Sequence, residues 1–275
     1  MDSCQKGNFF SFRGPLAEKV LVAYLCAGDP DLEKTVLWAE ALVAGGADCL
    51  ELGVPFSDPL ADGPVIQAAS LRALAAGVNL EKVLALGETI MKKLPKQVPL
   101  VLMTYLNPVL QYGAEKFSRE LALRGFKGAI IVDLPYEEGD DLRELLHRQK
   151  VSFIPLVAPT TREERLQKIV RRATGFVYCI SVTGVTGPRD VVDPRIRSLI
   201  PRIRDFSSLP VVVGFGVSRP EQAALLASFA DGIVVGSAFV DLIGSFQGDP
   251  ERVQEDLRER AKNLKTALTQ HVRRS

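Results

Sequence analysis

Short apolar runs alternate with longer amphipathic segments along most of the chain. The eight apolar runs are Val20–Leu25, Cys49–Gly53, Leu100–Tyr105, Ala129–Val132, Phe153–Leu156, Phe176–Ile180, Val211–Val213 and Gly232–Val235. The segments with helical period include Leu32–Val43, Glu115–Leu123, Glu137–Arg148, Arg162–Arg171 and Pro220–Phe229. Strands that are apolar throughout and alternate with helices are typical of a parallel sheet covered by helices.

This alternation predicts an α/β fold, a (β/α)8 (TIM) barrel in a single domain. Eight β-α units without linkers favour a closed barrel over an open doubly wound sheet, and the 275 residues are close to the roughly 250 of such barrels. We expect a domain over residues 1–275, with its core at about 17–245 and a C-terminal helix at about 250–273. Residues before Val20 are expected to form an N-terminal capping helix over one end of the barrel.

Composition and charge favour a globular enzyme that acts on a small molecule. Hydrophobic residues make up 47% of the chain, enough for a substantial core, so a disordered chain is excluded. The formal net charge is +1 with acids and bases mixed, so we expect neither nucleic acid nor membrane as a partner. Residues 1–19 lack a signal-peptide pattern, and no apolar run has membrane-spanning length, which predicts a cytoplasmic protein.

Cysteines and histidines indicate neither a metal site nor histidine catalysis. The four cysteines are widely separated, without C-x-x-C spacing or nearby histidines, so we expect reduced thiols and no metal. The two histidines, His147 and His271, lie in charge-rich helical patterns that indicate a solvated surface. Other side chains must then supply any chemistry.

Carboxylates cluster around the end of the second apolar run. Glu51 lies within it, and Asp58 and Asp62 follow in the loop VPFSDPLADGP. Alternate residues of a barrel strand face inward, so Glu51, flanked by Leu50 and Leu52, is expected to project into the barrel mouth. Burial there would raise its pKa and let Glu51 give and take a proton near neutral pH.

A structural interpretation of the same residues is that Glu51 forms an ion pair and the two aspartates serve as turn residues. Spacing alone does not separate the two interpretations. Three prolines within ten positions stiffen the loop, which favours catalysis because a rigid loop holds catalytic groups in place.

Glycine-rich segments follow the last three apolar runs, at 184–187, 214–216 and 236–237. Late β-α loops of such barrels often bind phosphate through backbone N–H groups and the N-terminus of a short helix. Neither a P-loop nor a complete dinucleotide fingerprint is present, so nucleotide binding is not expected. Any one of these glycines could equally serve only a turn, but their joint placement favours a phosphate site.

The string ELGVPFSDPLADGP at residues 51–64 closely resembles the signature of the tryptophan synthase alpha chain family. The resemblance continues through GDP at 28–30, NP at 107–108, VDLP at 132–135, SVTGVTG at 181–187 and GFGVS at 214–218. It implies a lyase of tryptophan biosynthesis that cleaves indole-3-glycerol phosphate to indole and glyceraldehyde 3-phosphate by a retro-aldol step. It also implies no cofactor in this chain, and a pyridoxal-phosphate-dependent beta chain that receives the indole within an alpha2-beta2 heterotetramer.

The resemblance also assigns roles to individual residues. Glu51 would be the catalytic acid and base, and Asp62 would accept a hydrogen bond from the indole N–H. Substrate-binding roles fall on Tyr24, Tyr105, Tyr178, Thr186 and Phe215, and phosphate-binding roles on Gly187, Gly216, Gly236 and Ser237. Thr186 would reach Asp62 when its loop closes, and Asp58, Pro55 and residues 107–111 would face the partner. Tyr24, Tyr105 and Phe215, assigned to the indole end, could equally fill the barrel.

Three rival functions stay open at this point. One is a free-standing lyase that releases indole. Another is a catalytically weak subunit that mainly activates the beta chain, although the presence of both Glu51 and Asp62 speaks against it. The last is an unrelated phosphosugar isomerase on the same barrel, which would leave the carboxylate loop unexplained.

Overall fold

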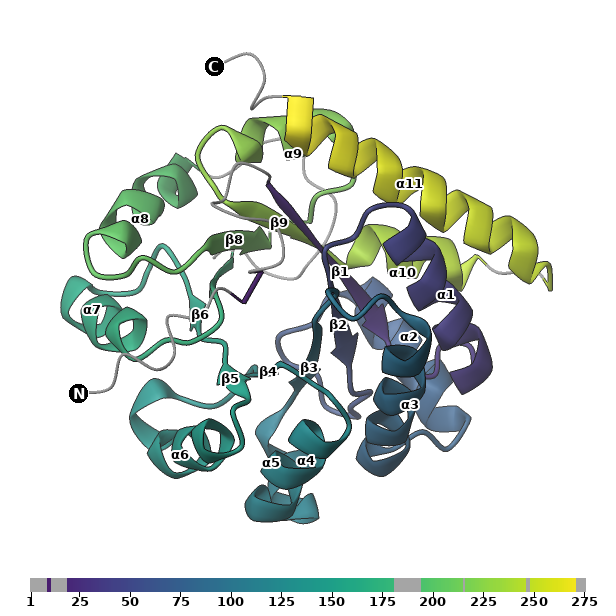
Figure 1. The fold of residues 1–275 in the computed structure, drawn as a ribbon, viewed down its shortest axis with the longest axis horizontal. Coiled ribbons are helices and arrows are strands. Elements are labelled where there is room, and N and C mark those ends of the chain that lie inside the picture. Colours follow the sequence, from purple (N-terminus) through teal and green to yellow (C-terminus); the bar gives the residue numbers. More distant parts are fainter. Residues whose placement is uncertain (1–8, 11–18, 181–193, 215, 246–247, 271–275) are drawn as a thin grey trace.

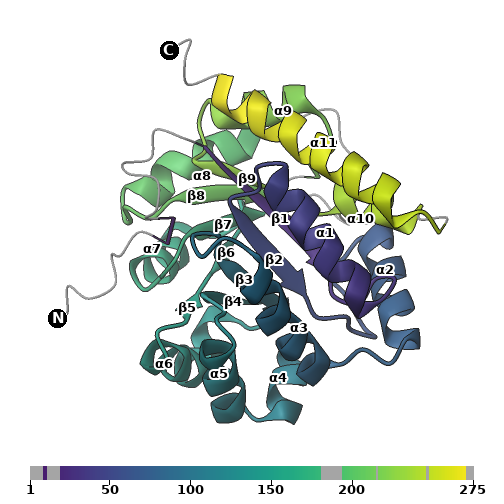
Figure 2. The ribbon, with the colours of Figure 1, turned by 45° about the vertical axis from the view of Figure 1, so that its right-hand side comes forward.

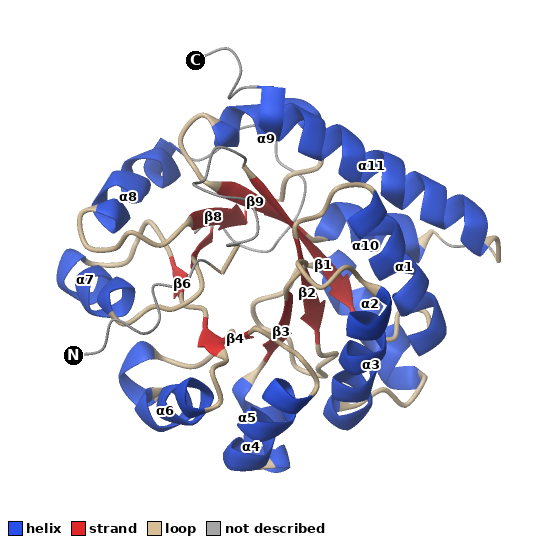
Figure 3. Ribbon diagram, in the orientation of Figure 1, coloured by secondary structure: helices blue, strands red, loops and turns tan. Residues whose placement is uncertain are grey.

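A computed structural model describes residues 9–10, 19–180, 194–214, 216–245 and 248–270, and within them a curled parallel sheet lies inside a ring of helices (Figures 1 and 3). The strands are β1 (Val20–Cys26), β2 (Cys49–Gly53), β3 (Leu100–Thr104), β4 (Gly128–Ile131), β5 (Ser152–Phe153), β6 (Leu156–Val157), β7 (Val177–Ile180), β8 (Val211–Gly214) and β9 (Gly232–Val235). Their order in the sheet is β5-β4-β3-β2-β1-β9-β8-β7-β6. The predicted α/β barrel is confirmed.

Helices follow the strands around the outside of the sheet. They are α1 (Leu32–Ala44), α2 (Pro64–Ala75), α3 (Leu80–Lys93), α4 (Leu106–Tyr112), α5 (Ala114–Leu123), the 3-10 turn η2 (Tyr136–Glu138), α6 (Asp140–Arg148), α7 (Glu163–Arg171), α8 (Pro194–Arg204), α9 (Pro220–Ala227), α10 (Ser237–Gly244) and α11 (Pro250–Gln270). Figure 2 shows α11 lying along α1 and α9. The capping helix expected before the first strand lies outside the described residues. None of the described helices is long and apolar enough to cross a membrane.

The predicted fifth strand is split, and the split stave closes the ring. β5 pairs with β4, and β6 pairs with β7, while only Ile154 and Pro155 separate β5 from β6. The Ile154 N–H donates to Ala129 O at 3.0 Å, and Pro155 O accepts from the Tyr178 N–H at 3.1 Å. Proline has no N–H to donate, so the ladder is interrupted at Pro155 although the stave continues through it. The nine strands therefore form the eight staves predicted from the sequence.

Side chains in the lumen fill the barrel toward the N-terminal ends of the strands. The lumen cluster consists of Phe10, Val20, Val22, Cys49, Val101, Ile130, Ile154, Phe176, Val212 and Val234. Phe9 and Phe10 each lie 5.6 Å from the Phe176 ring, just before β7 begins. Leu50 and Leu52 pack outward against the helices, as predicted. A ligand must therefore enter the lumen from the C-terminal ends of the strands.

An ion pair joins the long α11 helix to the start of the barrel. Asp48, just before β2, is 2% exposed, and its Oδ2 accepts from Lys265 Nζ at 2.7 Å and from the Leu21 N–H at 2.8 Å. Lys265 also donates to Lys19 O at 2.6 Å. A buried carboxylate that loses its cation is strongly destabilising, so this pair holds α11 against β1 and β2.

We expect Lys265→Met to lower the free energy of unfolding by about 3 kcal/mol, because it leaves the buried Asp48 charge without its cation. Urea denaturation at neutral pH measures the change. The control is Arg258→Met, which breaks an exposed pair with Glu255 on the same helix and should cost less than about 1 kcal/mol. Equal losses in the two variants would contradict the role given to Lys265.

Candidate active site

Glu51 projects into the barrel mouth from β2, where its Cα partners are Tyr24 of β1 and Val101 of β3. The residue is 1% exposed, and within the described part of the chain neither carboxylate oxygen has a hydrogen-bond partner. Burial raises the pKa of Glu51 to about 8, and the charge of Asp62 contributes to the rise. Such a group exchanges protons near neutral pH, and among the described residues no cation pairs with Glu51 as a structural ion pair would require.

Asp62 is held at the end of the loop between β2 and α2. Its Oδ2 accepts from the Tyr105 hydroxyl at 3.0 Å, and its backbone oxygen accepts from Gln67 Nε2 at 2.8 Å. The Ala61 N–H donates to the same Tyr105 hydroxyl at 3.2 Å, and the Tyr105 ring stacks on Phe56 with centroids 4.7 Å apart. Burial raises the pKa of Asp62, although the hydrogen bond from Tyr105 opposes this. The loop is therefore fixed from β3 as well as from α2.

Two further tyrosines, on β1 and β7, interact electrostatically with the carboxylates. Burial raises the pKa of the Tyr24 phenol well above its usual value, and nearby charges, those of both carboxylates among them, raise it further. Burial also raises the pKa of the Tyr178 phenol well above its usual value, and the charges of Glu51 and Asp62 raise it further. Tyr24 is the Cα partner of Glu51 across β1 and β2, and the Tyr178 ring packs beside Gly214 at the end of β8. Side chains from β1, β2, the carboxylate loop, the end of β3 and β7 thus converge at one mouth.

Two glycines make room for these rings, a role that the sequence did not predict, although Gly214 belongs to the 214–216 segment expected at the phosphate site. A Cβ atom on Gly53 would lie 2.2 Å from the Tyr24 hydroxyl oxygen, and one on Gly214 would lie 2.4 Å from the Tyr178 ring. Any larger residue would displace a ring that borders the carboxylates. Their sequence signal is the alternation itself, because Gly53 is two positions after Glu51 and therefore also faces inward.

The described phosphate candidates lie at the same end of the barrel. Gly214 and Val234 are Cα partners in β8 and β9, and Gly216 and Gly236 each follow two positions later. Ser237 begins α10, and the position of a Gly236 Cβ is 3.4 Å from the Tyr24 ring. A helix N-terminus presents free N–H groups and positive partial charge, which suit a phosphate. The other predicted residues, Thr186, Gly187 and Phe215, lie outside the described residues.

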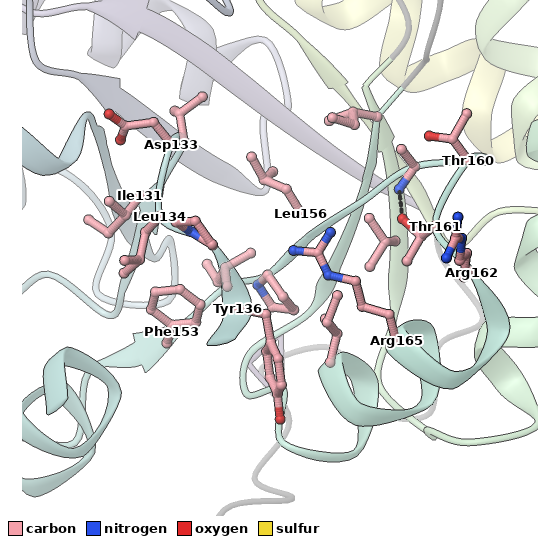
Figure 4. A pocket seen from close by; sticks show the side chains of 18 residues that line it. Ile131, Asp133, Leu134, Tyr136, Phe153, Leu156, Thr160, Thr161, Arg162 and Arg165 are labelled. Carbon is pink, nitrogen blue, oxygen red and sulfur yellow. Dashed lines mark hydrogen bonds between the residues drawn. The ribbon is translucent and has the colours of Figure 1, made fainter. Parts of the chain in front are cut away.

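A pocket of about 660 Å³ opens at this face, between the segments that follow β4 and β6 (Figure 4). Ile131, Phe153 and Leu156 form much of its apolar wall. Arg165 also lines this pocket (Figure 4), and its Nε lies 3.0 Å from Oε1 of Glu137. Among the described residues, no group of three or more histidine, cysteine or acidic side chains could hold a metal ion. The lining of this pocket includes Arg162 and Arg165 but neither Glu51 nor Asp62.

The sequence and the structure are both similar to those of known proteins. A family model described as the tryptophan synthase alpha chain matches residues 15–269. The tryptophan synthase alpha chain of Carboxydothermus hydrogenoformans is 46% identical over 263 residues, which cover 94% of this chain and 98% of that one. A solved protein from Aquifex aeolicus superposes with a TM-score of 0.85 at 41% identity, covering 94% of this chain and 96% of the other. A chain of Mycobacterium tuberculosis tryptophan synthase gives 0.85 at 37% identity, with 95% and 96% covered.

We expect Asp62→Asn to lower the pKa of Glu51 from about 8, because the substitution removes a neighbouring negative charge. Burial remains, so the pKa should stay above the ordinary 4.5. A pH titration of the carboxyl ¹³C NMR signal, assigned by its loss in Glu51→Gln, measures the shift. Asp58→Asn, an exposed change in the same loop, is the control and should leave the titration unchanged. An unchanged pKa in Asp62→Asn would mean that the two carboxylates do not interact.

Proposed function

The chain belongs to the tryptophan synthase alpha chain family and is thus a lyase of tryptophan biosynthesis that acts on indole-3-glycerol phosphate, and we propose that Glu51 and Asp62 perform this cleavage. The family needs no cofactor in the alpha chain, since pyridoxal phosphate is carried by the beta subunit. The observation that carries the proposal is the buried Glu51 carboxyl at the barrel mouth, which has no hydrogen-bond partner among the described residues and interacts with the charge of Asp62.

Cleavage of the bond between indole C3 and the glycerol chain needs two proton movements. Indole C3 must gain a proton, and the glycerol hydroxyl next to the breaking bond must lose one. Glu51, with a pKa of about 8, is protonated often enough at neutral pH to supply the first proton. The carboxylate that remains takes the hydroxyl proton as the carbon–carbon bond breaks. Glu51 thus ends the cycle protonated, and one residue serves as both acid and base.

Asp62 stabilises the charge that this protonation creates. Protonation at C3 gives an indolenine-like ring with positive charge at nitrogen, and a carboxylate that accepts the N–H hydrogen bond lowers its energy. The hydrogen bond from Tyr105 fixes the direction of the Asp62 carboxylate. Tyr24 and Tyr178 flank the ring, and Phe215 is proposed for the same end by the family resemblance.

The phosphate would bind at the ends of β7, β8 and β9. Gly216, Gly236 and Ser237 would donate backbone N–H groups or the serine hydroxyl, with the N-terminus of α10 directed at the anion. The resemblance adds Gly187 and, on the same loop, Thr186 near Asp62. Binding the phosphate at a distance from Glu51 holds the indole ring between the two carboxylates and raises the rate through orientation.

A complex with a tryptophan synthase beta chain is the proposed setting for this reaction, as an alpha2-beta2 heterotetramer in which indole passes directly to the partner. Leu60 and Leu110 support this, because they are 98% and 61% exposed on the carboxylate loop and on α4. Asp58 and Asn107 are exposed near them, whereas Pro55 is buried. Apolar side chains exposed beside a site entrance are typical of an interaction surface. The cytoplasmic location stays a prediction from the sequence.

Glu51→Gln should lower turnover of indole-3-glycerol phosphate by more than ~100-fold while leaving the fold intact, because the amide cannot exchange the proton. Asp62→Asn should give a smaller but clear loss. Indole release by the isolated chain measures both, with circular dichroism as the check on folding. Glu255→Gln, an exposed change on α11, is the control and should retain full turnover. Near-normal turnover in Glu51→Gln would rule out the proposed role.

Mixed with a tryptophan synthase beta chain, this chain should co-migrate on gel filtration as a heterotetramer and release less free indole than it does alone. Leu60→Asp/Leu110→Asp should weaken the complex at least ~10-fold, because charges would enter an apolar contact. Leu123→Asp is the matched control, since Leu123 is 72% exposed on α5. Unchanged indole release and no co-migration, with or without substrate, would instead favour a free-standing lyase.

A further inference from the structure

The GDP segment at residues 28–30 has no part in the proposed chemistry, yet it contains a buried charge. Asp29 is 2% exposed, and its two oxygens accept from Arg72 Nε at 2.7 Å and from Arg72 Nη2 at 2.8 Å. Two parallel hydrogen bonds of this kind fix the relative orientation of both side chains, which a single bond does not. The pair joins the loop after β1 to the last turn of α2.

Two further contacts pack the end of β1 and its loop against α2 and the residues that follow it. Cys26 Sγ lies 3.9 Å from Ser70 Oγ, both buried. A Cβ atom on Gly28 would lie 2.4 Å from Val78 Cγ2, so only glycine allows the loop to approach the residues that follow α2. Together with the ion pair from Arg72, these contacts define where α2 lies relative to β1.

The position of α2 in turn affects the catalytic carboxylate. Asp62 is two residues before the first residue of α2, and its backbone oxygen accepts from Gln67 Nε2 at 2.8 Å. Gln67 N–H also donates to Gly63 O at 2.9 Å. Asp62 is therefore held through its backbone by Gln67 of α2 and through its side chain by Tyr105, and a shift of the helix would move Asp62 relative to Glu51.

We propose that the Asp29–Arg72 ion pair is a positioning device that sets Asp62 against Glu51 by holding α2 on the end of β1. Neither residue reacts, and both act through Asp62. The kinetic consequence rests on the proposed function, since it requires that Asp62 serve the reaction. An electrostatic consequence does not, because displacement of Asp62 changes the proton affinity of Glu51 whatever reaction takes place.

The test is the double variant Asp29→Asn/Arg72→Met, which removes the ion pair without leaving an unpaired buried charge. We expect a loss of ~10- to 100-fold in kcat, since displacement of a catalytic group by about 1 Å can have such an effect. KM should change less than ~3-fold, because the proposed phosphate site lies on other strands. The pKa of Glu51, followed by the same carboxyl ¹³C titration, should fall as the Asp62 charge moves away.

The matched control is Asp231→Asn/Arg204→Met. Arg204 Nη2 lies 2.9 Å from Asp231 Oδ1, and the Arg204 side chain is exposed to a similar extent, 47% against 39% for Arg72. Arg204 ends α8 and Asp231 directly precedes β9, so this pair lies at the N-terminal ends of the strands, opposite the site. Its removal should leave kcat and the Glu51 titration unchanged.

Arg72→Lys keeps the charge but loses the paired geometry, so it should give an intermediate kcat and an intermediate Glu51 pKa. If the double variant does not fold, the kcat and the Glu51 pKa of this single variant test the proposal instead. A lower melting temperature with unchanged kcat and unchanged Glu51 pKa would overturn the proposal and leave the pair a purely structural role. A Glu51→Gln variant with normal turnover would instead defeat the proposed function, without affecting the titration result.

Discussion

The burial of one carboxyl group, Glu51, is the constraint on which the rest of the site depends. Removing a carboxylate from water without a partner is costly, and the cost is expressed as a pKa of about 8. A domain tolerates such a group only if its other contacts stabilise the fold. The closed ring of staves, the aromatic side chains at the far end of the lumen and the α11 ion pair supply those contacts. The contacts that stabilise the barrel thus lie toward the N-terminal ends of the strands, and the carboxylates lie at the C-terminal ends.

Rigid support for Asp62 is the second requirement of the site. A group that only accepts a hydrogen bond from substrate must be held at a defined distance and angle. Here the support comes from two directions, through Tyr105 after β3 and through α2 behind the loop. The prolines of the loop add to this stiffness by restricting its backbone. The same elements that hold Asp62 also hold its charge close to Glu51, so positioning and pKa are not independent.

Much of the fold was predictable because its signals are local. The bounds of β2 and β9 agree with the predicted runs residue for residue. The interruption in the fifth stave was not predicted, although Pro155 was its visible cause. The inward direction of Glu51 also followed from local alternation. The hydrogen bond from Tyr105 to Asp62 had no such signal, since Tyr105 was expected only to line the indole end of the pocket.

The sequence alone determined where the eight staves lie and where several of the helices lie, which face of β2 is inward, and which short strings resemble a known family. These properties depend on residues a few positions apart, where backbone geometry sets the spacing. Only the tertiary structure decided which side chains meet. Tyr105 and Asp62 are 43 positions apart, as are Arg72 and Asp29, and each pair forms because adjacent parallel strands place consecutive β-α units side by side. The pKa of Glu51 likewise depends on burial by the whole barrel, which no local pattern encodes.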